Sequence, residues 1–135
     1  MPELPEVETT KEGLKKDLVG QKILKVELSN KKLRFPYDKN FEKKIIGKYI
    51  LSITRRAKYI IFKLSNEVKI ISHLGMSGSY RIIDKKLFNN RQKIKHDHFI
   101  LKTDKFVVIY NDPRRFGYIL LHSDTNFEHE RLSHL

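Results

Sequence analysis

Cysteine is absent from the 135-residue chain. Without thiols, the chain can form no disulfide and offers no thiolate ligands of the kind that structural zinc motifs use. No run of about 18 apolar residues occurs, so the sequence predicts no membrane-spanning helix. A basic start followed by an apolar segment, the pattern of a secretory signal, is also missing. We therefore expect a cytoplasmic protein that does not act at a membrane.

Acidic residues are few compared with basic ones. The chain has 28 lysines and arginines against 16 aspartates and glutamates, a formal net charge of +12. A field of this sign favours a polyanion, and nucleic acid is the leading partner. The alternatives are a ribosomal-type protein or simply a lysine-rich chain from an AT-rich genome, and the many lysines and isoleucines keep the second alternative open.

Internal repeats, low-complexity tracts and flexible linkers are missing as well, so residues 1–135 are interpreted as one domain. The stretch from Pro5 to Val19 predicts a helix, because Val7, Leu14 and Leu18 recur at helical spacing. Acids come first in this stretch and lysines later, as the helix dipole favours. A short second helix is expected over residues 126–135.

The rest of the chain reads as short β-strands. In Tyr59–Leu64, for example, Ile60, Phe62 and Leu64 alternate with residues that suit an outer face. Hairpin turns are expected at residues 65–67 and 103–105. Many short strands of this kind indicate a sandwich or a barrel. The predicted strands are Lys22–Leu28, Tyr49–Thr54, Tyr59–Leu64, Val68–Leu74, Ser79–Ile83, His98–Lys102, Phe106–Tyr110 and Tyr118–Leu121.

The first six residues hold a possible nucleophile. Removal of Met1 in front of a residue as small as Pro2 exposes a secondary amine, and a free α-amine titrates near pH ~8. Condensation of this amine with an aldehyde-type carbon gives an iminium, which is a strong electron sink. Glu3 or Glu6 could serve as a general acid beside it. Alternatively, Pro2 and Pro5 stiffen an arm and start the helix, and the acids complement its dipole.

The segment Arg55–Tyr59 places three cations and an aromatic residue between two predicted strands. Such a density of positive charge suits phosphate contacts. Lys58 has the reach to place an ammonium near a substrate phosphate or a leaving base. The alternative is an ordinary solvated charge run.

In the segment His73–Gly78, two glycines bracket a methionine. Gly75 and Gly78 favour a tight turn that lifts Met76 out of the core, where it could wedge into a base stack. Methionine more often fills gaps in an interior, which is the alternative. His73 could donate a hydrogen bond to a phosphate, or it could be a hydrogen-bonded structural histidine.

The segment Asn111–Gly117 predicts a proline-started turn that presents two arginines and a phenylalanine. Arg114 and Phe116 are two residues apart, so in an extended conformation they would share one side and could enter a duplex together. Phe116 as a core residue is the alternative. Upstream, Lys95–His98 looks like a metal cluster, but no third ligand lies nearby, so no metal site is expected there.

These segments together resemble a known family, the bacterial formamidopyrimidine-DNA glycosylases that repair oxidised purines. The blocks fall in the family's order across nearly the whole chain, and the opening PELPE is highly specific. The resemblance implies an α+β, mostly β fold: a two-layer antiparallel β-sandwich flanked by an N-terminal helix and a short C-terminal helix. It rests on PELPEVET at Pro2–Thr9, RRAKY at Arg55–Tyr59, HLGMSG at His73–Gly78, KHDH at Lys95–His98 and DPRRFG at Asp112–Gly117.

The resemblance also implies roles for individual residues. Pro2 is expected to be the nucleophile, Glu3 the essential acid, Glu6 a supporting carboxylate and Lys58 a contact to substrate phosphate or base. The implied activity is excision of 8-oxoguanine and formamidopyrimidines from duplex DNA, followed by AP lyase cleavage through β- and δ-elimination.

The other residues carried over by the resemblance are expected to contact DNA. Met76, Arg114 and Phe116 correspond to the residues that fill the void and wedge the stack when the damaged base is extruded. His73 is expected to contact a phosphate, and His96 to lie near the lesion strand. The implied partner is double-stranded DNA with oxidised purines or abasic sites, bound by a monomer.

The sequence also departs from the family. Complete members are about twice as long and continue into a helix-two-turn-helix domain and a four-cysteine zinc finger, both of which are absent here. We therefore expect an N-terminal catalytic domain that carries no cofactor of its own. Three hypotheses remain: an active glycosylase/lyase, a DNA-binding module without catalysis, and a structural remnant that cannot engage a duplex.

Overall fold

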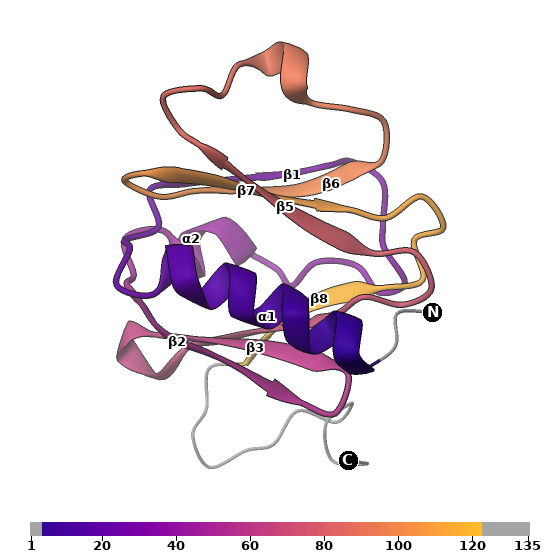
Figure 1. Cartoon of the computed structure of the whole chain (residues 1–135), viewed down its shortest axis with the longest axis horizontal. Coiled ribbons are helices and arrows are strands. Elements are labelled where there is room, and N and C mark those ends of the chain that lie inside the picture. Colours follow the sequence, from indigo (N-terminus) through magenta and orange to yellow (C-terminus); the bar gives the residue numbers. More distant parts are fainter. Residues whose placement is uncertain (1–3, 123–135) are drawn as a thin grey trace.

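The computed structural model describes residues 4–122 of the chain (Figure 1). Within this range, two four-stranded antiparallel sheets pack face to face and a long helix lies along one side. The predicted α+β, mostly β sandwich with an N-terminal helix is therefore confirmed. Pro2, Glu3 and the helix expected over residues 126–135 lie outside the described residues.

All the predicted strands are present. The first sheet has the strand order β1-β6-β7-β5 and the second has the order β2-β3-β4-β8. The two expected hairpin turns join β3 to β4, where the short 3-10 helix η1 (Ser65–Glu67) lies, and β6 to β7. The strands are β1 (Lys25–Leu28), β2 (Ile50–Arg56), β3 (Tyr59–Leu64), β4 (Lys69–His73), β5 (Ser79–Asp84), β6 (Asp97–Lys102), β7 (Phe106–Asn111) and β8 (Tyr118–His122).

The main hydrophobic core fills the space between the sheets. Ile60, Phe62 and Leu64 of β3 are buried there, as the period-two alternation predicts, and they share one cluster with Val108 and Tyr110 of β7. Burial of large aliphatic and aromatic side chains is the main favourable term that holds the two layers together.

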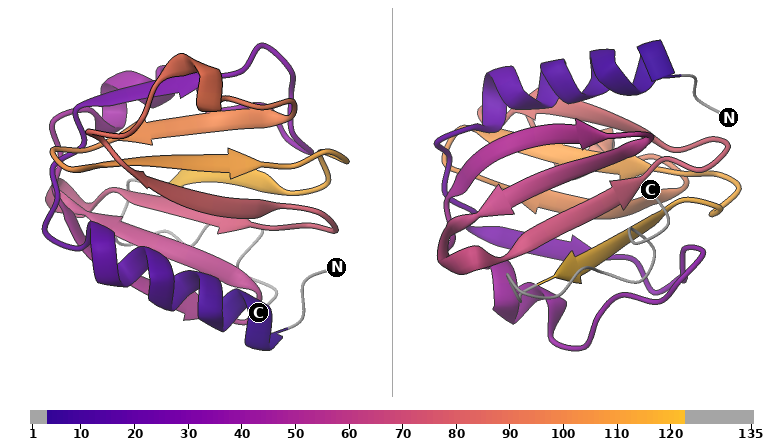
Figure 2. Two further views of the ribbon diagram at one scale, coloured as in Figure 1. Left: turned by 45° about the horizontal axis from the view of Figure 1, so that its top comes forward. Right: turned by 90° about the horizontal axis from the view of Figure 1, so that it is seen from below.

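Helix α1 (Leu4–Leu18) closes one side of the sandwich between the edge strands β2 and β5 (Figure 2). Its buried residues are Val7, Leu14 and Leu18, the three that the helical spacing singles out. The observed helix is shifted by one residue from the predicted range. Neither α-helix of the described range is long and apolar enough to cross a membrane.

A second short helix, α2 (Phe41–Ile45), is absent from the sequence prediction. Five residues are too few to reveal a 3.6-residue repeat, and Asn40 at its N-cap makes no side-chain capping bond. The helix forms because Phe41 and Ile45, four residues apart, are both buried in the main core. Tertiary packing therefore stabilises α2.

Two connections pass from one sheet to the other at the same end of the sandwich. The first leaves β4 at His73 and enters β5 at Ser79, and the second leaves β7 at Asn111 and enters β8 at Tyr118. The register pairs His73 with Tyr118 in one sheet and Ser79 with Asn111 in the other. The two connections must therefore lie side by side at both of their ends.

Candidate nucleic-acid interface

The two side-by-side connections, residues 74–78 and 112–117, are here called the finger loops (Figure 2). Met76 on the first is 43% exposed and Phe116 on the second is 45% exposed. The alternatives that placed either residue in the core are therefore wrong. The Arg114 guanidinium carbon lies 5.2 Å from the centre of the Phe116 ring, so these two side chains project together.

The route by which Arg114 and Phe116 come together differs from the extended segment that the sequence predicts. Pro113 and Arg114 form a turn, and Arg115 has a left-handed backbone with φ 56°. The Arg115 N–H donates to the Asp112 carbonyl at 3.3 Å, which closes the turn. A hydrogen-bonded turn, rather than an extended segment, therefore brings the side chains of Arg114 and Phe116 together.

Glycine allows the finger loops to touch. Gly75 has a φ of 63°, and a Cβ placed there would collide with the backbone of Phe116 and Gly117. A Cβ on Gly117 would in turn collide with the Tyr110 hydroxyl. The Gly78 N–H donates to the Leu74 carbonyl at 2.7 Å, which closes the tight turn predicted around Met76.

Asp112 joins the finger loops, and sequence reasoning gave it no role. Its side chain is fully buried. One carboxylate oxygen accepts from the Ser77 hydroxyl at 2.8 Å and the Arg115 N–H at 3.0 Å. The other accepts from the Tyr110 hydroxyl and the Gly117 N–H, both at 2.9 Å. An aspartate before a proline signals a turn in a sequence, but nothing local indicates that it is buried.

His73 is both structural and able to donate. Its Nδ1 accepts the Gly75 N–H at 3.0 Å, which assigns the proton of the neutral ring to Nε2. The ring stacks on Tyr118 at 5.2 Å. Burial lowers the pKa of His73, and the charges of Lys58 and Arg34 lower it further. At pH 7 the ring is therefore neutral, with Nε2–H as a donor.

The turn between β2 and β3 carries Lys58, whose positive charge acts on His73. Ala57 in this turn has a left-handed backbone with φ 51°. Its carbonyl accepts a bond from Arg55 at 3.0 Å, and Arg55 Nε also donates to Glu8 of α1 at 2.7 Å. Of the three cations in RRAKY, Arg55 thus ties the turn to the helix.

Glu6 lies exposed in the first turn of α1, where a carboxylate complements the helix dipole. This position agrees with both the supporting role and the structural alternative. The roles predicted for Pro2 and Glu3 concern residues outside the described range, so these assignments stay predictions.

The segment around His96 lies against the start of the second finger loop. The His96 carbonyl accepts the Asp112 N–H at 3.0 Å, and the His98 ring bonds through Nε2 to the Asp112 carbonyl at 3.0 Å. Asp97 forms a two-pronged ion pair with Arg81, at 2.8 and 2.7 Å. Among residues 4–122, no group of three side chains is arranged to hold a metal ion.

Arg34 is a further cation that sequence reasoning missed. Its backbone N–H donates to the Gly117 carbonyl at 3.0 Å, and its charge acts on His73. The side chain is exposed. The basic run at residues 31–34 is the only local signal, and it does not indicate which of its cations reaches the finger loops.

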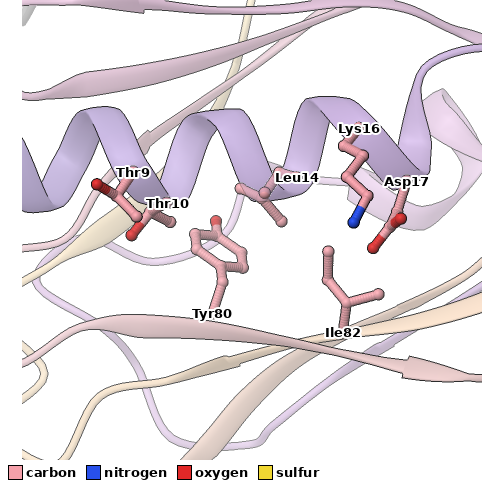
Figure 3. Close-up of a pocket in the computed structure, with 8 residues that line it drawn as sticks. Thr9, Thr10, Leu14, Lys16, Asp17, Tyr80 and Ile82 are labelled. Carbon is pink, nitrogen blue, oxygen red and sulfur yellow. The ribbon is translucent and has the colours of Figure 1, made fainter.

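A cavity of about 260 Å³ lies between α1 and β5 (Figure 3). Tyr80 and Ile82 project from β5 towards Thr10 and Leu14 of the helix. The Tyr80 hydroxyl bonds to Ser72 at 2.6 Å, and burial raises the pKa of Tyr80, so this hydroxyl stays protonated. The cavity is a groove between helix and strand that Lys16 of α1 also lines, and none of the finger-loop residues lines it.

The structure thus brings Lys58, His73, His96 and the finger loops to one end of the sandwich, with α1 starting at the same end (Figure 2). Cations and neutral donors suit phosphates, and protruding apolar side chains suit base steps. These features are typical of the nucleic-acid-binding surface of a β-sandwich domain.

The chain belongs to the formamidopyrimidine-DNA glycosylase family. The model of the formamidopyrimidine-DNA glycosylase N-terminal domain matches residues 1–119. The family resemblance drawn from the sequence motifs is thereby confirmed.

Curated relatives and solved structures agree with this membership. The formamidopyrimidine-DNA glycosylases of Bartonella tribocorum and Hahella chejuensis are 46% and 43% identical over the whole chain, which covers 50% and 48% of their lengths. The Lactococcus lactis enzyme bound to DNA with an AP site has a TM-score of 0.79 at 37% identity, covering 90% of this chain and 45% of that one. A MutM complex with carbocyclic 8-oxoguanine DNA has a TM-score of 0.79 at 38% identity, covering 90% of this chain and 44% of that one. The chain spans about half the length of these relatives.

Proposed function

We propose that this chain is the catalytic part of a DNA repair glycosylase with AP lyase activity, which excises 8-oxoguanine and formamidopyrimidines from duplex DNA. The observation that carries the proposal is the pair of finger loops, which exposes Met76, Arg114 and Phe116 beside Lys58 and His73. Solved relatives of the same fold are complexes with damaged DNA, which supports DNA as the partner of this surface.

A base within a duplex must be extruded before its glycosidic bond can be attacked. In the proposed complex, Met76 and Arg114 occupy the space that the base leaves, and Arg114 faces the orphaned cytosine. Phe116 wedges the stack and bends the duplex, at an unstacking cost of about a few kcal/mol per step. The contact between Arg114 and Phe116 favours their joint insertion.

Phosphates flanking the lesion are the proposed partners of Lys58, His73 and His96. Lys58 supplies a point charge, and the neutral His73 ring supplies an Nε2–H donor that does not depend on protonation near pH 7. Half to two-thirds of protein–DNA hydrogen bonds are of this positioning kind. They would hold the extruded sugar near the N-terminus of the chain.

The proposed chemistry begins with the neutral amine of Pro2. Its nitrogen forms a bond to the sugar C1′, while the bond from C1′ to the damaged purine breaks and the purine leaves with that electron pair and a proton. Glu3 protonates the ring oxygen, the ring opens to a C1′ iminium, and Glu6 supports this arrangement. Like charge from Lys58 and Arg114 favours the neutral form of the amine.

The iminium then acts as an electron sink. It acidifies the C2′ proton, and loss of that proton expels the 3′ phosphate in a β-elimination. A second elimination expels the 5′ phosphate, and hydrolysis frees Pro2. The product is a one-nucleotide gap flanked by phosphates.

The second candidate function is a damaged-DNA-binding domain with weak or no catalysis. The observation in its favour is that the chain spans about half the length of its relatives. Fewer phosphate contacts would weaken binding and reduce its salt dependence. In either case the proposed binding unit is a monomer.

Borohydride trapping separates the two candidates. The untagged chain, with removal of Met1 verified by mass, is incubated with duplexes that carry either 8-oxoguanine opposite cytosine or an abasic site. We expect a covalent adduct on both duplexes. An adduct on the abasic duplex alone would assign lesion capture to residues outside this chain, and no adduct on either would favour the binding domain.

Variants identify the reacting groups in this experiment. Pro2→Gly should abolish the proline iminium, and Glu3→Gln should reduce base excision by at least about 100-fold, since a positioned general acid contributes about 10²–10⁴-fold. Glu12→Gln is the matched control, because Glu12 is an exposed carboxylate on α1 that pairs with Lys11. Equal trapping by Pro2→Gly and the unaltered chain would contradict the assigned nucleophile.

A further inference from the structure

One hydroxyl connects the two finger loops. Ser77 Oγ donates to the Asp112 carboxylate at 2.8 Å and accepts the Arg114 N–H at 3.1 Å. A serine hydroxyl has one proton to donate and lone pairs to accept, so both bonds form at once. A single side chain of the first loop therefore holds the second loop at two successive points.

Asp112 extends this connection to the base of the second loop. Its other donors are the Tyr110 hydroxyl at the end of β7 and the N–H groups of Arg115 and Gly117. Hydrogen bonds to an ionised acceptor are roughly twice as strong as neutral ones. The backbone from residue 112 to residue 117 is thereby folded around one carboxylate.

The loops also touch through their backbones. Gly75 lies so close to Gly117 that a Cβ on Gly75 would collide with the Gly117 N–H group. No side chain separates the two segments at this point, so the first loop cannot move toward the second without displacing it. The Ser77 hydroxyl, the Asp112 carboxylate and this backbone contact all hold the two loops together.

We propose that Ser77 and Asp112 are positioning residues that make the finger loops one rigid unit, so that Met76 enters the DNA in the same step as Arg114 and Phe116. This inference rests on the proposed function for the surface that enters DNA. It adds that insertion is a single event, and that neither Ser77 nor Asp112 needs to contact the DNA.

Fluorescence of 2-aminopurine beside an abasic site tests this inference, because unstacking of the neighbouring base reports insertion in real time. This signal requires binding alone, not amine chemistry. If borohydride trapping at Pro2 fails while the fluorescence signal is intact, the proposed catalysis is rejected. The coupling of the loops is not affected by that result.

The informative variant is Ser77→Ala, which removes both bonds at a partly exposed position. We expect insertion to slow about tenfold, which is about 1.4 kcal/mol in activation free energy, and initial association at low salt to change less than twofold. Ser77→Thr keeps the hydroxyl and should restore most of the rate. Ser79→Ala, at the exposed start of β5, is the matched control and should insert at the unaltered rate.

A mutant cycle makes the test independent of any single variant. In the unaltered background, Met76→Ala and Phe116→Ala should slow insertion by factors that do not multiply, because the rigid unit couples the two side chains energetically. In the Ser77→Ala background the two factors should multiply. Multiplicative factors in both backgrounds, wild-type insertion by Ser77→Ala, or no insertion signal from the unaltered chain would each overturn the coupling.

Discussion

Two carboxylates at the same end of the molecule are held in opposite ways. Asp97, whose side chain is 4% exposed, pairs with both terminal guanidinium nitrogens of Arg81 at 2.8 and 2.7 Å. It also accepts the Ile94 N–H and the Asn111 amide. Asp112 is completely buried, and its four bonds come from two hydroxyls and two backbone N–H groups.

This difference decides whether a neighbouring arginine is held by a carboxylate or stays exposed at the surface. Arg81 is occupied by Asp97 and by the Gln92 carbonyl, so it fixes the segment before β6 in place. Asp112 is satisfied by neutral donors, which leaves the exposed Arg114 guanidinium stacked on Phe116 at the surface. A carboxylate held by neutral groups can therefore order a loop and keep that loop's cations available for a polyanion.

The largest loss of stability is expected for Asp112→Asn. The asparagine NH₂ group would face the Gly117 N–H or the Arg115 N–H, so a buried donor would lose its acceptor. We expect a loss of about 3 kcal/mol in the free energy of unfolding, measured by urea denaturation, since unsatisfied buried groups cost about 1–3 kcal/mol each. Asp104→Asn, an exposed aspartate in the turn before β7, is the control. A loss smaller than that of Asp97→Asn would show that the neutral donors around Asp112 contribute less stability than the ion pair of Asp97.

A smaller effect is expected for Asp97→Asn, about 2 kcal/mol, because Arg81 is 31% exposed and can turn to solvent when its partner is removed. Burial alone would raise the pKa of Asp97, but bonds from Arg81, Asn111 and the Ile94 N–H outweigh it and lower this pKa below 3.8.

The sign of this pKa shift sets the pH dependence of the Asp97→Asn effect. The pair's contribution is present above about pH 3.8 and lost as the pH falls through the lowered folded-state pKa. Urea titrations at pH 7 and below pH 3.8 measure the stability difference between the variant and the unaltered chain. A difference that stays constant over this range would show that the ion pair is not its source.

The smallest effect on stability is expected for Glu8→Gln, because the Glu8 side chain is far more exposed than Asp97 or Asp112. Glu8 bonds to Arg55 at 2.7 Å and to Lys11 at 2.9 Å, and these bonds, that of Arg55 first, lower the pKa of Glu8. Exposed ion pairs are screened by water and salt. The melting temperature at physiological salt should be unchanged within error by calorimetry, and a clear drop would mean that Arg55 and Glu8 carry more of the attachment of α1 than their exposure suggests.

Local patterns in the sequence predicted most of the fold. Strand β3 matches its predicted range at both ends, because Ile60, Phe62 and Leu64 alternate with outward residues. Helix α1 was predicted from the spacing of its buried residues. Helix α2 was missed because its formation depends on the core that receives Phe41 and Ile45 rather than on a repeat.

The candidate site was predicted less completely. Motifs singled out Met76, Arg114 and Phe116, each of which stands next to a glycine or a proline. They also singled out Lys58, in a run of cations, and His73, at the start of HLGMSG. The roles of Asp112 and Arg34 were not visible, because their significance lies in partners distant along the chain: Asp112 bonds to Ser77, 35 residues away, and the backbone of Arg34 bonds to Gly117.

The strands, the long helix, the positive charge and the family can be predicted from the chain alone, because each depends on composition or on short motifs. The meeting of the finger loops and the burial of Asp112 between them follow from the tertiary structure. The reason is register: His73 pairs with Tyr118 and Ser79 with Asn111, and these pairings between distant strands arise from packing of the two sheets rather than from any local preference.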